Sequence, residues 1–238
     1  MKRTNLIVRT LVMLLKFLLA AFLLVIGYGT VLAIIELSPQ LWQSLTPRHS
    51  FLLGTAIFLP LYLIFRRRFA VWGTMEHELT HALTALLFLR RVRSISAGEK
   101  HGETEFSGRG SALITLTPYF LPTLALLPLA LRPLLAPAYQ SWVDLLLGSL
   151  FLYYLISNLR ESHPAQPDLH RHGLLFSYCV ILPLNLLLLS LLLLMGSGNE
   201  QLLSQFLNGV LEPLPQLLDF VRAQVPILTA PTAGAGGV

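Results

Sequence analysis

Five consecutive residues, His77-Glu78-Leu79-Thr80-His81, place two imidazoles and a carboxylate at the spacing H-E-x-x-H. On an α-helix, residues four positions apart lie on the same face, so His77 and His81 could bind one metal ion together. This ligand pair is typical of Zn²⁺, and the carboxylate of Glu78 would then be placed to take a proton from a water molecule at the metal. The motif therefore predicts zinc-dependent hydrolysis, with His77 and His81 as metal ligands and Glu78 as the catalytic residue.

A zinc site of this kind needs a third ligand from the protein and leaves the fourth position to water. Outside the motif, the segment 160–173 is the richest in donor side chains. Asp168 is the preferred third ligand, because a carboxylate suits the metal and Pro164 and Pro167 limit the flexibility of the segment. The other candidates are three histidines of the same segment and one aspartate of an apolar run, namely His163, His170, His172 and Asp144.

The composition is that of an integral membrane protein. Hydrophobic residues make up 54% of the 238 residues and charged residues only 12%, whereas soluble domains have about 25% charged residues. The net charge is +5, but the basic residues cluster beside apolar runs, as at 66–68 and 90–93. Such clusters are typical of membrane flanks that face anionic lipid, and they argue against nucleic acid as a partner. Cys179 is the only cysteine, which excludes a disulfide framework and a cysteine-rich zinc site.

Six apolar runs are predicted to be membrane helices, so the expected fold is an all-α polytopic membrane protein. A run of about 20 apolar residues is needed to cross a bilayer, and the second run is shorter than this. The fourth run contains three prolines, which membrane helices tolerate where neighbours or water satisfy the freed carbonyl groups. Basic residues before the first run predict a cytoplasmic N-terminus. The six runs are 17–35, 51–65, 71–89, 111–131, 142–159 and 174–195.

The remaining segments divide the chain. Residues 94–107 alternate around a glycine-bounded polar turn, which predicts a small β-hairpin after the motif helix. Residues 1–196 are expected to form one membrane-embedded domain. Residues 197–223 repeat apolar side chains at helical spacing and predict an amphipathic helix in the membrane interface, with a short helix packed on the rest of the protein as the alternative. Residues 224–238 are expected to be a disordered tail.

The run HELTHAL at 77–83, followed by basic residues, a short hairpin and a glycine, resembles the site-2-protease-type membrane metallopeptidases, most closely the smaller branch without an inserted PDZ domain. The resemblance covers about residues 76–173. One departure concerns Asn185, which begins a segment like the aspartate-bearing signature of the larger members but is followed by leucines, so its role stays open. A later segment is similar to the second signature of the smaller branch: Gly148, Tyr154, Arg160, Glu161, Gln166, Pro167, Asp168, Leu169 and Gly173.

This resemblance implies that His77, His81 and Asp168 bind zinc and that Glu78 is the catalytic acid and base. It also implies that the protein cleaves a peptide bond of a transmembrane protein substrate within the lipid bilayer, with the bacterial inner membrane as the expected location. The edge of the hairpin could accept an extended substrate as an added strand. A non-enzymatic membrane protein that binds metal or scaffolds partners is the alternative. No feature of the sequence indicates an oligomeric state.

Overall fold

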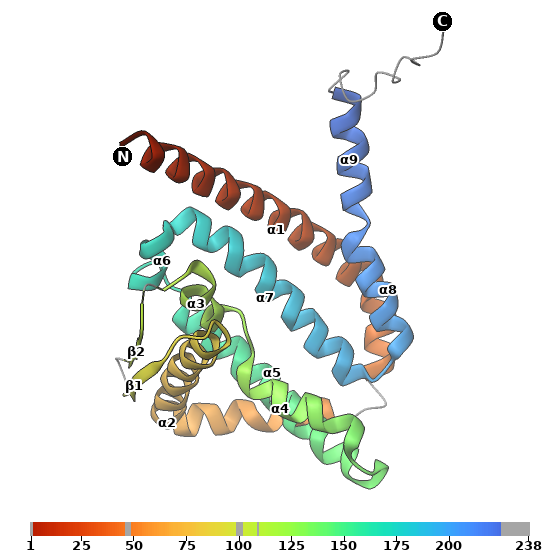
Figure 1. The fold of residues 1–238 in the computed structure, drawn as a ribbon. Helices are drawn as coiled ribbons and strands as arrows, with labels where there is room; N and C mark the ends of the chain where they lie inside the picture. Colours follow the sequence, from red (N-terminus) through yellow and green to blue (C-terminus); the bar gives the residue numbers. More distant parts are fainter. Residues whose placement is uncertain (1, 46–48, 99–101, 109, 225–238) are drawn as a thin grey trace, which may run out of the picture.

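The computed structural model describes residues 2–45, 49–98, 102–108 and 110–224 (Figure 1). Apart from Gln224, the tail expected over 224–238 lies outside these residues. Helices dominate the described chain, which confirms the expected all-α class. The elements in chain order are α1 (Lys2–Leu45), α2 (His49–Leu87), β1 (Val92–Ala97), β2 (Gly102–Phe106), α3 (Ala112–Leu116), η1 (Thr117–Tyr119), α4 (Thr123–Leu131), η2 (Arg132–Leu134), α5 (Pro137–Glu161), α6 (Pro167–His172), α7 (Leu174–Ser197), α8 (Glu200–Leu211) and α9 (Pro213–Gln224).

Four of the described helices, α1, α2, α5 and α7, are long and apolar enough to cross a membrane, which fits an integral membrane protein. A fifth span is added if the bent pair formed by α3–η1 and α4–η2, which meets at 76°, counts as one broken span. The expectation of six spans was therefore too high. The difference arises in α2, where the runs expected at 51–65 and 71–89 form one helix that bends at Phe65 (φ −106°, ψ 24°). The arginines and alanine between them favour helix, so the chain bends there without ending the helix.

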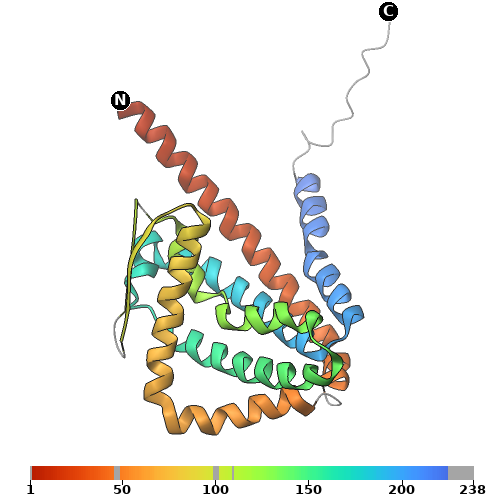
Figure 2. The same cartoon turned by 60° about the horizontal axis from the view of Figure 1, so that its bottom comes forward.

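The bend divides α2 into a first arm, residues 49–64, and a second arm, residues 66–87, which point in clearly different directions (Figure 2). The first arm crosses α5 closely, because Gly54 and Gly148 meet at the crossing. A Cβ at either glycine would overlap a carbonyl group of the opposite helix. Thr55 Oγ1 donates to the Gly148 carbonyl (3.0 Å) and Ser149 Oγ to the Gly54 carbonyl (3.1 Å). Small residues with hydrogen bonds between helices are typical of membrane helix packing, and here they fix α5 against α2.

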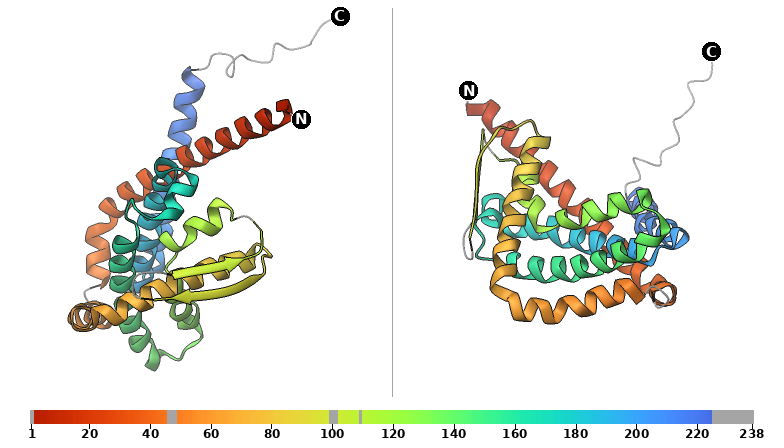
Figure 3. Two further views of the ribbon diagram at one scale, coloured as in Figure 1. Left: turned by 90° about the vertical axis from the view of Figure 1, so that its left-hand side faces the viewer. Right: turned by 90° about the horizontal axis from the view of Figure 1, so that it is seen from below.

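The expected hairpin is present. β1 and β2 pair antiparallel, with Ile95 opposite Thr104 and an irregularity between Val92 and Ser94. The turn at 99–101 lies outside the described residues. The hairpin lies beside the second arm of α2 (Figure 3). The hairpin therefore lies next to the helix that carries the H-E-x-x-H motif.

The break between η1 and α4 leaves backbone carbonyl groups without helical partners, and side chains of α5 and α7 satisfy them. Asn185 Nδ2 (2.7 Å) and Asn158 Nδ2 (2.5 Å) both donate to the Tyr119 carbonyl. The Tyr154 hydroxyl lies within hydrogen-bonding distance of the Phe120 carbonyl and of Asn185 Oδ1, and its single hydrogen can go to either acceptor. Asn185, whose role the sequence left open, therefore stabilises the broken helix.

The second arm of α2 holds the other side of the same break. Glu76 Oε1 accepts a hydrogen bond from the Leu124 N–H in the first turn of α4 (3.0 Å). The hydroxyl groups of Thr80 and Thr123 lie 2.6 Å apart. Both contacts come from residues beside or within the motif. The break and the motif helix are thus held as one structural unit.

The C-terminal segment forms two helices, where one amphipathic helix was expected over 197–223. The Asn199 side chain caps α8 by accepting a hydrogen bond from the Leu202 N–H (3.2 Å). α8 buries Leu202, Phe206 and Val210 in the core cluster that it shares with α1. The second helix, α9, begins at Pro213, because proline is tolerated in the first turn of a helix. The position of this segment in a membrane interface stays a prediction.

Replacing Asn185 tests whether hydrogen bonds to the free carbonyl groups at the break between η1 and α4 stabilise the fold. We expect Asn185→Leu to lower the free energy of unfolding by about 1–2 kcal/mol, because the buried hydrogen bond to the Tyr119 carbonyl is lost and Tyr154 keeps only one acceptor. Asn208→Leu is the matched control, since Asn208 is exposed on α8, and it should change stability little. Denaturation of both variants in detergent, followed by circular dichroism, measures the difference. Equal stability of the two variants would contradict the role given to Asn185.

Candidate metal centre

The structure brings together His77 and His81 of α2 and Asp168 of α6. One ligand atom from each residue lies within 4.8 Å of the others, and His81 Nε2 lies 3.2 Å from Asp168 Oδ2. In the part of the chain that the structure describes, no other group of three histidine, cysteine or acidic side chains meets this criterion. These three residues could hold a metal ion, and they are the three ligands predicted from the sequence.

The ring of His81 is oriented by a backbone group. His81 Nδ1 lies 2.8 Å from the Ile114 carbonyl oxygen of α3, in a buried position. A carbonyl oxygen only accepts, so Nδ1 carries the hydrogen, and loss of the proton on Nε2 would leave a lone pair there for a metal ion. Histidines that bind metals typically donate their second N–H in this way. The Ser111 side chain in turn caps α3 by accepting from the Ile114 N–H (3.3 Å).

The ring of His77 is held by aromatic packing. It meets the ring of Tyr119 edge-on, with centroids 4.8 Å apart and planes at 87°. Its centroid lies 4.9 Å from that of His81. Tyr119 is 1% exposed, and it belongs to η1, whose backbone the side chains of α5 and α7 hold in place. Edge-to-face packing of this kind limits how far the His77 ring can turn.

Asp168 stands in the first turn of α6, which Pro167 begins. The next residue, Leu169, is fully buried, and its carbonyl accepts a hydrogen bond from Ser177 Oγ of α7 (2.9 Å). Burial raises the pKa of Asp168, but the hydrogen bond and the charge of His81 outweigh this effect, so its pKa lies below its usual value. The side chain is therefore an ionised carboxylate at neutral pH, the form in which it can bind a cation.

Glu78 contacts the start of strand β2. Thr104 Oγ1 lies 2.7 Å from Glu78 Oε2 and 2.9 Å from the Glu78 carbonyl oxygen, and its hydrogen can go to either acceptor. A Cβ at Gly102 would lie 2.5 Å from Glu78 Oε1, so only glycine allows the strand to approach this closely. Glu78 is 6% exposed. The hairpin thus positions the carboxylate that the motif predicts as the general base.

The metal ligands and Glu78 share one cavity of about 470 Å³. Its wall is largely polar and includes Thr104 of β2 and Arg160 and Glu161 at the end of α5, which form an ion pair (3.0 Å). Polar residues from α2, β2, α5 and α6 therefore surround a cavity in a protein whose helices are otherwise apolar. Such a cavity can admit water to the candidate metal centre.

The other candidate ligands lie outside the three-residue cluster. His170 Nε2 contacts the Pro164 carbonyl oxygen (2.8 Å), and Asp144 forms an ion pair with Arg132 (2.8 Å). His163 and His172 likewise do not belong to the cluster.

Three groups that position the site were not predicted from the sequence: Thr104, Tyr119 and the Ile114 carbonyl. Only Thr104 could have been suspected from the sequence, since it lies on a predicted strand, where alternate side chains face opposite sides of the sheet.

Metal analysis of the purified protein tests the centre. We expect about one ion per chain, lost in His77→Ala, His81→Ala and Asp168→Ala, because a site with two protein ligands binds metal far more weakly. His170→Ala is the control and should keep the ion, since its side chain lies outside the cluster. Mass spectrometry of the protein in detergent measures metal content. Full retention in Asp168→Ala would show that the third ligand lies elsewhere.

Comparison with models of protein families, with curated proteins and with solved structures finds no match to this chain. The function is therefore inferred from the chemistry of the residues that the fold brings together. Those residues are the two imidazoles of α2, the carboxylate of α6 and the carboxylate of Glu78 beneath β2.

Proposed function

We propose that this protein is a membrane-embedded zinc metalloprotease of the site-2-protease type, which hydrolyses a peptide bond in a transmembrane protein substrate. The observation that carries the proposal is the meeting of His77, His81 and Asp168 with Glu78 in one polar cavity. Two imidazoles and one carboxylate are a donor set typical of catalytic zinc, with a position left for water. We further propose the inner membrane of a bacterium as its location, on the basis of the family resemblance.

When bound, zinc would supply Lewis acidity to the reacting water and to the scissile carbonyl group. The protein's own contribution centres on Glu78, whose carboxylate faces the same cavity as the two imidazoles. It would accept a proton from the attacking water and deliver it to the leaving amine. Thr104 fixes the position of this carboxylate through the contact at Oε2. The geometry thus fits general acid–base catalysis of amide hydrolysis.

Strand β2 offers a route by which the substrate could bind. One edge of β2 pairs with β1, while Gly102, Glu103, Thr104 and Phe106 line the cavity. An extended peptide added to the free edge would pass beside Glu78, with backbone hydrogen bonds to the strand. A transmembrane helix would first have to unwind locally, because helical backbone hides its carbonyl groups from attack.

The variant Glu78→Gln separates a protease from a metal-binding scaffold. We expect it to abolish cleavage of casein and of a membrane-anchored test substrate while keeping the metal, because an amide cannot accept the proton. Glu212→Gln, on the distant C-terminal side of α8, is the control and should remain active. Gel electrophoresis and mass spectrometry of the products measure cleavage. Unchanged cleavage by Glu78→Gln, or cleavage that survives a zinc chelator, would contradict the proposal.

Two substitutions of Thr104 test its role in positioning Glu78. We expect Thr104→Val to lower the cleavage rate by at least about tenfold, since a hydrogen bond to a charged group contributes about 1.5–3 kcal/mol. Thr104→Ser keeps the hydroxyl group and should restore most of the rate. Initial cleavage rates, measured beside metal content, distinguish positioning from loss of the site. Equal rates in the two variants would show that the hydroxyl group is not needed.

A further inference from the structure

A second cavity, of about 610 Å³, adjoins the metal cavity along β2. The walls of the two cavities share Thr104, Phe106 and Arg171. They are therefore two ends of one cleft between the hairpin and α6. We call the second end the basic pocket, and its lining residues are Arg93, Thr104, Glu105, Phe106, Gly108, Gly110, Arg171 and His172.

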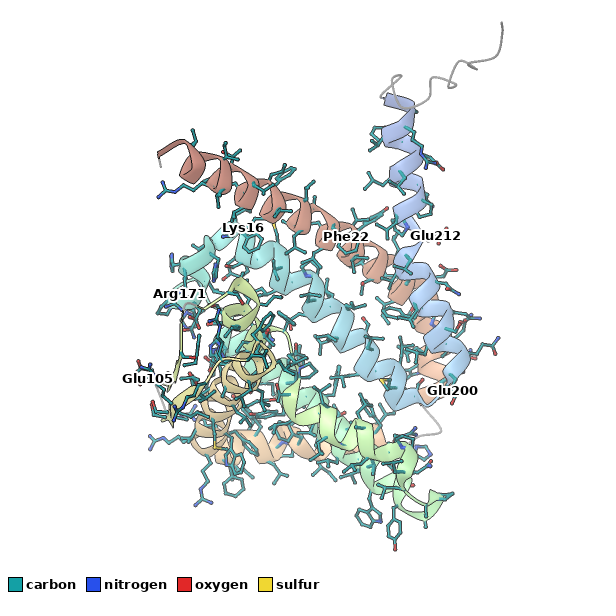
Figure 4. The ribbon with its side chains drawn as sticks, viewed as in Figure 1. Lys16, Phe22, Glu105, Arg171, Glu200 and Glu212 are labelled. Atoms are coloured by element: carbon teal, nitrogen blue, oxygen red, sulfur yellow. The ribbon has the colours of Figure 1, made fainter. Side chains whose placement is uncertain are left out.

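Positive charge is concentrated in the basic pocket, although the charge of Arg171 also acts on Asp168 and helps to lower its pKa. Arg93 and Arg171 form no hydrogen bond or ion pair with any residue that the structure describes, and Glu105 is the one acidic residue in the lining. Arg171 and Glu105 lie on the same side of the molecule (Figure 4). A third guanidinium stands at the rim, since a Cβ at Gly108 would lie 2.6 Å from Arg90 Nη1. Gly108 also has a positive φ of 82°, which favours glycine.

The surroundings of His172 point to the same excess of positive charge. Burial, Lys16 and Arg171 together hold the pKa of His172 below its usual value. The metal end of the cleft has the opposite character, because Glu78, Glu103 and Glu161 all line it and its Arg160 is paired with Glu161. The cleft is therefore polarised along its length, from acidic at the metal centre to basic beyond Phe106.

We propose that the basic pocket binds a carboxylate side chain of the substrate, so that the protein selects peptides with Asp or Glu at one position on one side of the scissile bond. This inference rests on the proposed function. Thr104 contacts Glu78, and Phe106 lines the basic pocket two residues further along β2, so we expect the selected residue to lie about two or more positions from the bond that is cut. Guanidinium groups bind carboxylates through paired, charge-assisted hydrogen bonds, which gives the pocket its chemical preference.

The position of the pocket favours a substrate over a lipid as the source of the carboxylate or other anion. Thr104, which contacts Glu78, also lines the basic pocket. A peptide lying along β2 from Glu78 would therefore reach Arg171 without leaving the cleft. An anionic lipid headgroup is the competing occupant, and the experiment distinguishes the two.

Peptide binding to the metal-loaded Glu78→Gln protein tests the proposal without requiring turnover. Short peptides would carry Asp, Asn or Lys at each position in turn around one cleavable bond, and fluorescence anisotropy would measure affinity. We expect Asp at one position to bind about tenfold more tightly than Asn. In the double variant Arg93→Gln, Arg171→Gln, the ratio should fall to about one. Arg68→Gln, on the exposed bend of α2, is the control and should keep the preference.

Each outcome bears on one proposal. Equal affinity for Asp and Asn at every position would overturn the basic pocket as a carboxylate subsite. An Asp preference that vanishes when phosphatidylglycerol is added to the micelles would assign the pocket to a lipid headgroup instead. If peptides bind with the expected preference but the wild-type protein cuts none of them, the proposed proteolysis fails while the binding preference stands. Cleavage without preference overturns only the subsite.

Discussion

The need to satisfy buried backbone groups at the break between η1 and α4 determines much of this structure. In apolar surroundings an unpaired carbonyl costs several kcal/mol, so Asn158, Tyr154 and Asn185 converge on two carbonyl groups from two different helices. The same short segment carries Tyr119, which packs against His77. The polar contacts that make a broken helix tolerable therefore also determine where one metal ligand lies.

A second constraint joins ligands that are far apart in the chain. His81 and Asp168 are separated by 87 positions, and the helix between them that crosses α2 is α5. The crossing at Gly54 and Gly148 has no room for a side chain, so its geometry is narrowly defined. Asp168 follows α5 by a short segment and is anchored to α7 through Leu169. Close helix packing in the middle of α5 thus contributes to the precision of the site that follows its C-terminal end.

The sequence predicted the parts of the site that depend on local spacing. The H-E-x-x-H motif placed His77 and His81 on one helix face, and the alternation after it predicted the hairpin. Asp168 was preferred on chemical grounds and by resemblance, because no local pattern reveals which segment lies opposite a helix. The continuous α2 was missed for a related reason: the arginines at 66–68 look like a membrane boundary, yet they favour helix. The contacts of Thr104, Tyr119 and the Ile114 carbonyl depend on tertiary packing, which spacing along the chain does not encode.

The bend of α2 bears on how deeply the candidate metal centre is placed in the lipid bilayer. The second arm, residues 66–87, is roughly 30 Å long, which is close to the hydrocarbon thickness of a typical bilayer, and Arg68 and Arg90 flank it. Arginines at both ends favour the two polar surfaces, so the arm has little freedom to slide along the membrane normal. If this arm crosses the bilayer by itself, His77 and His81 would lie near the midplane, because both stand near the middle of the arm. The thickness of the surrounding lipid would therefore set how far water must travel to reach them, and a thinner membrane would shorten that path.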